Sequence, residues 1–264
     1  MTPSTKSRMN CQTFPDPSEA PLKNSKTAIV RPIVGRKSPK LGPLAMMISS
    51  GPDFERLVRI LPAAEHPSRL LMSRLFLDAD ARYAVIGPVV GAPYAVMLLE
   101  PLIAWGAREI CFMGWCGAIS PKATIGDIIV PTGAIIDEGT SLGYDASLLD
   151  TARPSETLNR RIKTVLTGRG CDFLEGLVWS TDAIYRETPE KVTEFQARNA
   201  LAVEMELSAL FTAGRYRGIQ IGAVLVVSDE LTTLSWKPGF KLDRFRESRQ
   251  TLIEAMKDLC QNPL

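Results

Sequence analysis

The sequence predicts an α/β fold, a single domain of three layers (α/β/α) built around a central, mixed and largely parallel sheet. Two observations support this prediction. Six apolar runs of strand length follow residue 43, and several are apolar at every position, which is typical of strands buried on both faces. Helix-like segments alternate with these runs, and such alternation favours a layered α/β architecture. The expected strands are 44–49, 83–87, 109–114, 127–131, 177–180 and 221–228.

The expected helices carry start and stop signals at their ends. Ser155 stands in an N-cap position, and Gly168 and Gly218 stand where two of the helices should end. No internal repeat or linker interrupts residues 44–260, so we expect one domain. The expected helices are 92–107, 155–170, 202–218 and 243–260.

Residues 1–43 are expected to lie outside the domain, which we assign to residues 44–264. Residues 1 to about 25 are rich in Pro, Ser, Thr and Lys without periodicity, which predicts a partly disordered tail. The stretch that follows predicts an arm on the surface. The start of the chain lacks the continuous apolar stretch of a signal peptide, so we expect a cytoplasmic location.

Composition excludes several classes of function. The 264 residues include 31 Lys or Arg and 29 Asp or Glu. The resulting net charge of +2 argues against a nucleic-acid partner. No apolar run approaches the roughly 18 residues of a membrane-spanning helix. The five cysteines form no C-x-x-C pair, and the single histidine, His66, cannot make a two-histidine zinc site. We therefore expect no metal, no cofactor, a non-catalytic His66, and chemistry that depends on carboxylates.

Three polar segments follow buried runs, where ligands bind in folds of this class. The first is a glycine-rich turn that contains Gly114. In the second, Glu204 and Glu206 flank Met205, and a carboxylate is a natural acceptor for the two hydroxyls of a ribose. In the third, Asp229 follows a run of nonpolar residues. Each also has a purely structural interpretation, as a tight turn, an acidic helix start or a turn cap.

Taken together, the motifs resemble those of the nucleoside phosphorylase family, which contains purine nucleoside and uridine phosphorylases and methylthioadenosine nucleosidases. The resemblance spans roughly residues 44–260. It rests on GWCGAIS, IGDIIVP and DEGTS, then TDAIYRE, VEMELSALF and VVSDE, in that order. It implies a nucleoside phosphorylase-like fold, a small-molecule nucleoside as the substrate, and a homo-oligomer (dimer, trimer or hexamer) in which a neighbouring subunit completes each site.

The resemblance also implies roles for individual residues. Glu206 matches the glutamate that binds the ribose 2′ and 3′ hydroxyls, with Met205 under the sugar and Glu204 beside it. Asp229 matches the catalytic acid that protonates the purine N7, and Ser228 helps to orient the base. Because uridine-cleaving members lack this aspartate, the resemblance favours a purine. The remaining implied contacts are Tyr185, Arg186, Trp115 and Cys116 to the base, and Arg69 and Gly114 to phosphate.

The sequence departs from the family where phosphate should bind. Phe54, Phe112 and Trp115 occupy positions that match two arginines and a small hydroxyl residue, and none of the three supplies a charge to a phosphate dianion. Three hypotheses follow. The preferred one is phosphorolysis, with phosphate as the co-substrate and a place in purine salvage. The others are hydrolysis by water activated by Asp53 or Glu55, and binding of a nucleoside without turnover.

Overall fold

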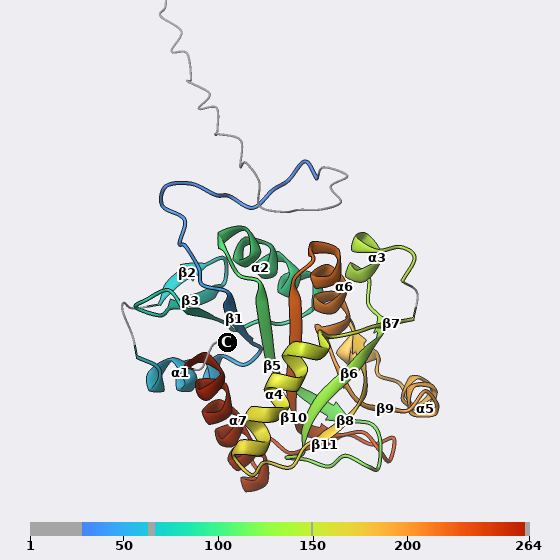
Figure 1. Cartoon of the computed structure of the whole chain (residues 1–264). Helices are drawn as coiled ribbons and strands as arrows, with labels where there is room; N and C mark the ends of the chain where they lie inside the picture. The colour runs from blue at the N-terminus through green and yellow to red at the C-terminus, as the bar shows by residue number, and fades with distance from the viewer. Residues whose placement is uncertain (1–27, 63–66, 149, 262–264) are drawn as a thin grey trace, which may run out of the picture.

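The computed structural model describes residues 28–62, 67–148 and 150–261 and confirms the predicted α/β class. A central mixed sheet carries helices on both faces (Figure 1). Residues 28–43 run along the surface without a helix or strand, and the Trp105 indole N–H donates to the Ile33 carbonyl at 3.0 Å. The predicted tail and His66 lie outside the described residues.

Eleven strands pair within the described part of the chain. The pairs β1–β4, β1–β5, β5–β10, β6–β8 and β8–β9 are parallel, and the others are antiparallel. The strands are β1 (Leu44–Ile48), β2 (Ser68–Leu70), β3 (Ser73–Leu77), β4 (Tyr83–Gly87), β5 (Glu109–Ala118), β6 (Ile128–Asp137), β7 (Thr151–Ala152), β8 (Leu174–Thr181), β9 (Ala200–Glu204), β10 (Gln220–Glu230) and β11 (Lys237–Pro238).

Part of the sheet closes on itself, which the sequence did not predict. β10 pairs with both β5 and β6, while β9 pairs with both β5 and β8. The five strands β5, β10, β6, β8 and β9 therefore form a ring. This closure brings the ends of β5, β9 and β10 together, so side chains far apart in sequence meet there.

The helices cover the two faces of the sheet. α2 and α6 pack on one face, whereas α1, α4 and α7 pack on the other (Figure 1). β1 is apolar at every position because both of its faces are buried. Ala45 and Met47 belong to one core cluster, and Leu44, Met46 and Ile48 belong to the other. The helices are α1 (Gly51–Ile60), α2 (Ala92–Trp105), α3 (Thr140–Tyr144), α4 (Glu156–Gly168), α5 (Pro189–Ala197), α6 (Leu207–Arg217), α7 (Asp243–Gln261) and the 3₁₀ turn η1 (Ile184–Arg186).

The helix predicted over 202–218 is wrong at its start. Residues 200–204 form β9, which pairs with β5 and β8, and the helix begins only at Leu207. Local periodicity missed the strand because its pairing partners are more than twenty residues away in sequence. The consequence is functional: Glu204 ends a strand, whereas Glu206 takes the N-cap position of α6.

Two kinds of feature are absent from the described residues. No helix in them is long and apolar enough to cross a membrane. Over the same residues, no group of three or more His, Cys, Asp or Glu side chains is arranged to hold a metal ion.

Candidate active site

A cavity of about 460 Å³ lies where β1, β5, β9 and β10 end. Its wall brings together segments that the sequence separates by more than 150 residues. It combines apolar surface with several carboxyl groups, as expected of a site for a polar small molecule with a flat apolar part. The lining residues are Ser49, Ser50, Pro52, Val90, Trp115, Cys116, Gly117, Ile184, Glu187, Val203, Glu204, Met205, Glu206, Ser228, Asp229 and Phe240.

Glu206 presents a buried carboxyl to this cavity from the start of α6. The side chain is 5% exposed, and its Oε1 accepts a hydrogen bond from the main-chain N–H of Gly91 at 2.5 Å. Gly91 has a φ of +84°, a conformation that favours glycine, so the turn that presents this N–H is built around that residue. Burial, and then the charge of Glu204, raise the pKa of Glu206 above its ordinary value.

Glu204 also lines the cavity, but its oxygens are already engaged. Oε2 accepts from the main-chain N–H groups of Glu206 at 2.7 Å and Leu207 at 2.8 Å, and Oε1 accepts from the Ser180 hydroxyl. Burial raises the pKa of Glu204, although these hydrogen bonds oppose the shift. The geometry thus favours a role in shaping the start of α6 over the ribose contact that we predicted for Glu204.

Asp229 reaches the same cavity from β10. The register between β10 and β5 shifts between Val227 and Asp229, and this irregularity re-aims the strand end. Asp229 Oδ1 lies 2.6 Å from the Ser228 hydroxyl, and Oδ2 accepts from the Trp236 indole N–H at 2.9 Å. The Ser228 hydroxyl also lies 3.2 Å from the carbonyl oxygen of Cys116.

A buried ion pair contacts the wall of the cavity at Trp115. The Trp115 indole N–H donates to Asp53 Oδ2 at 2.7 Å, and the Arg249 Nε donates to Asp53 Oδ1 at 3.0 Å. The Arg249 guanidinium lies 4.6 Å from the centre of the Trp115 ring. Asp53 and Arg249 are 1% and 7% exposed, and neither lines the cavity.

The segment after β8 contributes different residues from those predicted. Tyr185 is 97% exposed, Arg186 is exposed, and neither lines the cavity. Their neighbours Ile184 and Glu187 do. The segment forms a 3₁₀ turn, in which successive side chains point in different directions, so the sequence could locate the segment but not the residues that face inward.

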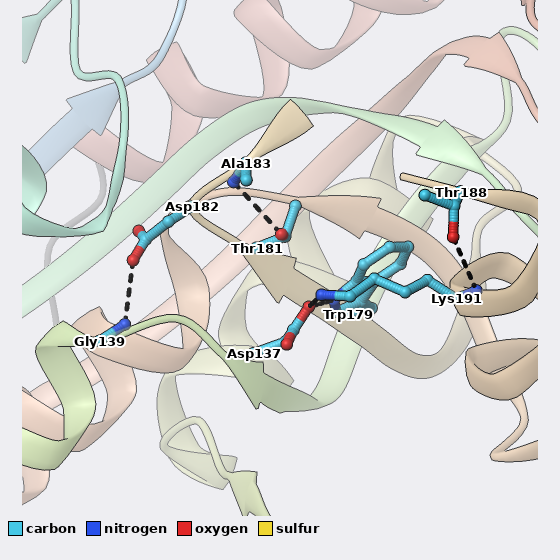
Figure 2. A network of polar contacts seen from close by, with 8 residues as sticks. All are labelled: Asp137, Gly139, Trp179, Thr181, Asp182, Ala183, Thr188 and Lys191. Atoms are coloured by element: carbon cyan, nitrogen blue, oxygen red, sulfur yellow. Dashed lines mark hydrogen bonds and ion pairs between the residues drawn. The ribbon is translucent and has the colours of Figure 1, made fainter. Parts of the chain in front are cut away.

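Polar contacts fix this turn at both ends (Figure 2). Before it, the main-chain N–H of Gly139 donates to Asp182 Oδ2 at 2.9 Å. After it, the Thr188 hydroxyl caps α5 by accepting from the Lys191 N–H at 3.4 Å. Lys191 Nζ in turn donates to Asp137 Oδ2 at 2.6 Å. The turn is therefore anchored on both sides, which holds the residues that line the cavity in place.

The chain is similar to known proteins in both sequence and fold. The Phosphorylase superfamily profile matches residues 43–261. The chain belongs to this superfamily. A guanosine phosphorylase from Halorubrum lacusprofundi is 28% identical over 211 residues, which cover 76% of this chain and 86% of the relative. A DeoD-type purine nucleoside phosphorylase from Bacillus cereus is 31% identical over 184 residues, covering 68% and 74%.

Two solved structures show the same phosphorylase-superfamily fold. A uridine phosphorylase from Vibrio fischeri aligns with a TM-score of 0.73 and 25% identity, covering 84% of this chain and 94% of the other. An AMP nucleosidase from Bacteroides thetaiotaomicron aligns with a TM-score of 0.66 and 20% identity, covering 84% and 92%, a likeness in fold alone. The superfamily and the relatives named above place the chain among enzymes of nucleoside metabolism.

In this member of the phosphorylase superfamily, two of the residues that we matched to phosphate ligands are buried in the apolar core. Phe54 and Phe112 are 1% and 0% exposed, and a Cβ added to Gly114 would lie 2.5 Å from the Phe112 ring. Gly114 thus makes room for Phe112 and does not line the cavity, contrary to its predicted role. Arg69 is exposed, donates to the Leu71 carbonyl at 2.9 Å and lies outside the cavity of its own chain.

The two carboxylates that we considered as bases for water also lie outside the cavity. Asp53 is held by Arg249 and Trp115, and Glu55 forms a half-exposed ion pair with Arg74. Neither has the free, cavity-facing oxygen that activation of a water requires.

Sequence reasoning missed Arg249 and Glu187, and only Arg249 left a signal. Arg249 lies on the apolar stripe of α7, four residues after Phe245 and three before Leu252, all three of them buried. A charge at such a position indicates a buried partner. Glu187 lies in a segment without periodicity, so nothing in the sequence marks its direction.

Proposed function

We propose that this chain cleaves the N-glycosidic bond of a purine nucleoside and transfers the ribosyl group to phosphate. One observation carries the proposal: Glu206 and Asp229, which come from different elements, line one cavity together with Met205 and Ser228. These are the residues that the family resemblance matched to the sugar and the base. A cavity with a sugar acceptor at one side and an acid at another has the groups that glycosidic cleavage needs.

In this proposal Glu206 accepts hydrogen bonds from the ribose 2′ and 3′ hydroxyls, and Met205 packs against the sugar. Cleavage develops positive charge on the ribosyl group and negative charge on the departing purine. Asp229 then delivers a proton to N7, which neutralises the leaving base, while Ser228 holds the Asp229 carboxyl. Proton transfer from a placed acid contributes about 10²–10⁴-fold to such a reaction.

The nucleophile separates this proposal from its second candidate, hydrolysis. Among the described residues that line the cavity, none carries a positive charge, and this favours water over a phosphate dianion. The relatives named as phosphorylases favour phosphate. In the phosphorolytic version, a neighbouring copy supplies Arg69 to the anion.

That version needs a homo-oligomer, which we also propose. Leu71, Met72, Val90 and Met97 are exposed apolar side chains, from 46% to 71%, and Val90 also lines the cavity. A second copy that covered them would close the cavity at the same time. Light scattering should return a multiple of the 28.9 kDa chain mass. A monomer at micromolar concentration would contradict the oligomer and remove Arg69 as a ligand.

The reaction is tested with a panel of adenosine, inosine, guanosine and uridine, each with and without phosphate. We expect free purine and ribose 1-phosphate, formed only when phosphate is present. Free ribose at the same rate without phosphate would establish hydrolysis instead. Binding of a nucleoside without any release of base would identify a non-catalytic binding protein and overturn both versions.

A further inference from the structure

Trp236 brings a hydrogen-bond donor to Asp229 from outside the strand that carries this carboxyl. Its indole N–H donates to Asp229 Oδ2 at 2.9 Å, while the Ser228 hydroxyl lies 2.6 Å from Oδ1. Both oxygens of the carboxyl therefore have a partner within the protein. The Trp236 side chain is 62% exposed, so burial of its ring does not explain where the indole lies.

The backbone holds Trp236 in place, because β11 folds back on the end of β10 (Figure 1). Asp229 pairs with Pro238, and the Gly239 N–H donates to the Ser228 carbonyl at 2.9 Å. A Cβ added to Gly239 would lie 2.7 Å from that carbonyl oxygen, so this close return requires a glycine. The indole N–H is thus placed beside the carboxyl before any ligand binds.

No cation lines the described part of the cavity to balance a charge on Asp229. Lys237, the nearest basic residue along the chain, donates to Glu230 Oε2 at 3.1 Å. A carboxylate that forms at Asp229 during a reaction must therefore be stabilised by hydrogen-bond donors.

The two donors beside Asp229 are not equivalent. The Ser228 hydroxyl has one proton, and it also lies 3.2 Å from a second acceptor, the Cys116 carbonyl oxygen. The Trp236 indole N–H can only donate, and Asp229 is its acceptor within the described residues. Trp236 is therefore the donor that is committed to this carboxyl.

We infer that Trp236 is a positioning residue: its indole N–H holds the Asp229 carboxyl and stabilises the carboxylate that remains when the proton leaves. This inference rests on the proposed function, in which the Asp229 O–H bond breaks, N7 gains the proton and the electron pair of the glycosidic bond stays on the purine. Hydrogen bonds to an ionised carboxylate are stronger than those to a neutral acid. The contact therefore strengthens as the proton moves, which favours the transition state over the bound substrate.

The test compares wild type with Trp236→Phe, which keeps a ring but has no N–H, and Trp236→Gln, which keeps a donor of similar reach. With the purine nucleoside that wild type cleaves fastest, Trp236→Phe should lower kcat about 10-fold or more. Trp236→Gln should stay within about 3-fold of wild type. KM should change by no more than about 2-fold, since Trp236 does not line the cavity. Equal losses of kcat in the two variants would assign the effect to the ring and overturn the inference.

A ribosyl nitrophenyl ether separates the role of the acid from a general disturbance of the cavity. Its leaving group needs no proton, so Trp236→Phe should keep the wild-type rate on this substrate to within about 2-fold. Trp105→Phe is the matched control, because it also removes one indole N–H, which donates to the Ile33 carbonyl at 3.0 Å outside the cavity. It should leave both rates unchanged. Equal losses in Trp236→Phe on both substrates would overturn the inference.

The double variant Asp229→Asn/Trp236→Phe shows whether the two residues act together. Once residue 229 cannot give a proton, loss of the Trp236 N–H should cost no more than about 2-fold on the purine nucleoside. A further loss of about 10-fold would overturn the inference, as would a Trp236→Phe enzyme with the wild-type kcat. In both cases cleavage by wild type would still support the proposed function. A wild type that cleaves no nucleoside would overturn the proposed function, and the role of Trp236 with it.

Discussion

Two regions that meet at the cavity differ in how their charged groups are satisfied. Around the start of α6, Glu204 and Glu206 are buried carboxyls without a cation, held only by hydrogen-bond donors such as the Gly91 N–H. Around Trp115, the buried carboxyl of Asp53 is neutralised by Arg249. The first region leaves the Glu206 carboxyl available to a ligand, whereas in the second the carboxylate of Asp53 is paired within the protein.

The difference bears on the predicted departure of this chain from phosphorylases at the anion site. At the positions matched to anion ligands, the chain has Phe54 and Phe112, both inside the core, and an indole whose N–H is bound to Asp53. These side chains stabilise the fold and leave no donor for an anion. Arg249, which lies against the Trp115 ring, is paired with Asp53. We therefore expect substitutions around Trp115 to affect stability, and substitutions around α6 and β10 to affect activity.

The largest effect should come from Arg249→Met. Removal of the guanidinium leaves Asp53 as a buried charge without a counter-ion, and breaking one side of such a pair costs about 3–5 kcal/mol. Urea denaturation measures the loss. Arg246→Met on the same helix is the control, because its pair with Asp243 is exposed and should change stability by less than about 1 kcal/mol.

The double variant Asp53→Asn/Arg249→Met sharpens this test. If the charge left on Asp53 is the cause, the double variant should be more stable than Arg249→Met alone, because no unpaired charge is left. A double variant as unstable as the sum of the two single variants would show that packing of Arg249 on Trp115 matters more than charge.

Glu206→Gln should have the next largest effect, this time on activity. In the proposed reaction the ionised carboxyl accepts from two sugar hydroxyls, and each charge-assisted bond contributes about 1.5–3 kcal/mol. We expect kcat/KM to fall about 100-fold or more, with the fold retained. Glu247→Gln, at an exposed position on α7, should leave the rate unchanged. A folded Glu206→Gln enzyme with the wild-type rate would remove Glu206 from the sugar site.

Much of this architecture could be predicted from the sequence, because local patterns determine it. β1, β4 and β5 are apolar at nearly every position, which identifies strands covered on both faces. What could not be predicted depends on long-range pairing. β9 was taken for part of a helix, since its partners in β5 and β8 are distant in sequence.

The site residues divide in the same way, into those marked by local motifs and those placed by long-range contacts. Glu206 and Asp229 could be proposed because each lies within a short motif. The pattern of α7 marks Arg249 as a buried charge, but its partner could not be predicted, because Asp53 lies 196 residues away in sequence. Glu187 could not either, because the direction of a side chain in a 3₁₀ turn depends on the anchoring contacts of Asp182 and Thr188.

Asp229→Asn should slow the reaction about 100-fold with natural purine nucleosides. The amide keeps a hydrogen bond to the base but cannot transfer a proton. With a ribosyl nitrophenyl ether, whose leaving group needs no protonation, the loss should be far smaller. Equal losses on both substrates, measured as kcat, would mean that Asp229 positions the ligand and that the proton comes from another group.

The smallest expected effect is a change in the free energy of unfolding with pH, caused by the buried carboxyls at the start of α6. Burial raises the pKa of Glu206 and of Glu204 above the ordinary value of 4.5. The folded state therefore binds more protons than the unfolded state above that pH, so the free energy of unfolding falls as pH rises through neutrality. The contribution of Glu206 to stability is therefore present near pH ~5 and is lost as the pH rises towards ~8.

Glu206→Gln removes this titration, so its stability relative to wild type should increase between pH ~5 and pH ~8. Glu247→Gln, at an exposed position on α7, is the control and should leave the stability difference between the two pH values as it is in wild type. Carboxyls whose pKa is lowered, such as Asp78 beside Arg82, change stability only in more acidic solution and do not interfere. Denaturation midpoints of the three proteins at the two pH values measure the difference. If the relative stability of Glu206→Gln were the same at both pH values, burial of the Glu206 carboxyl would not raise its pKa in the folded protein.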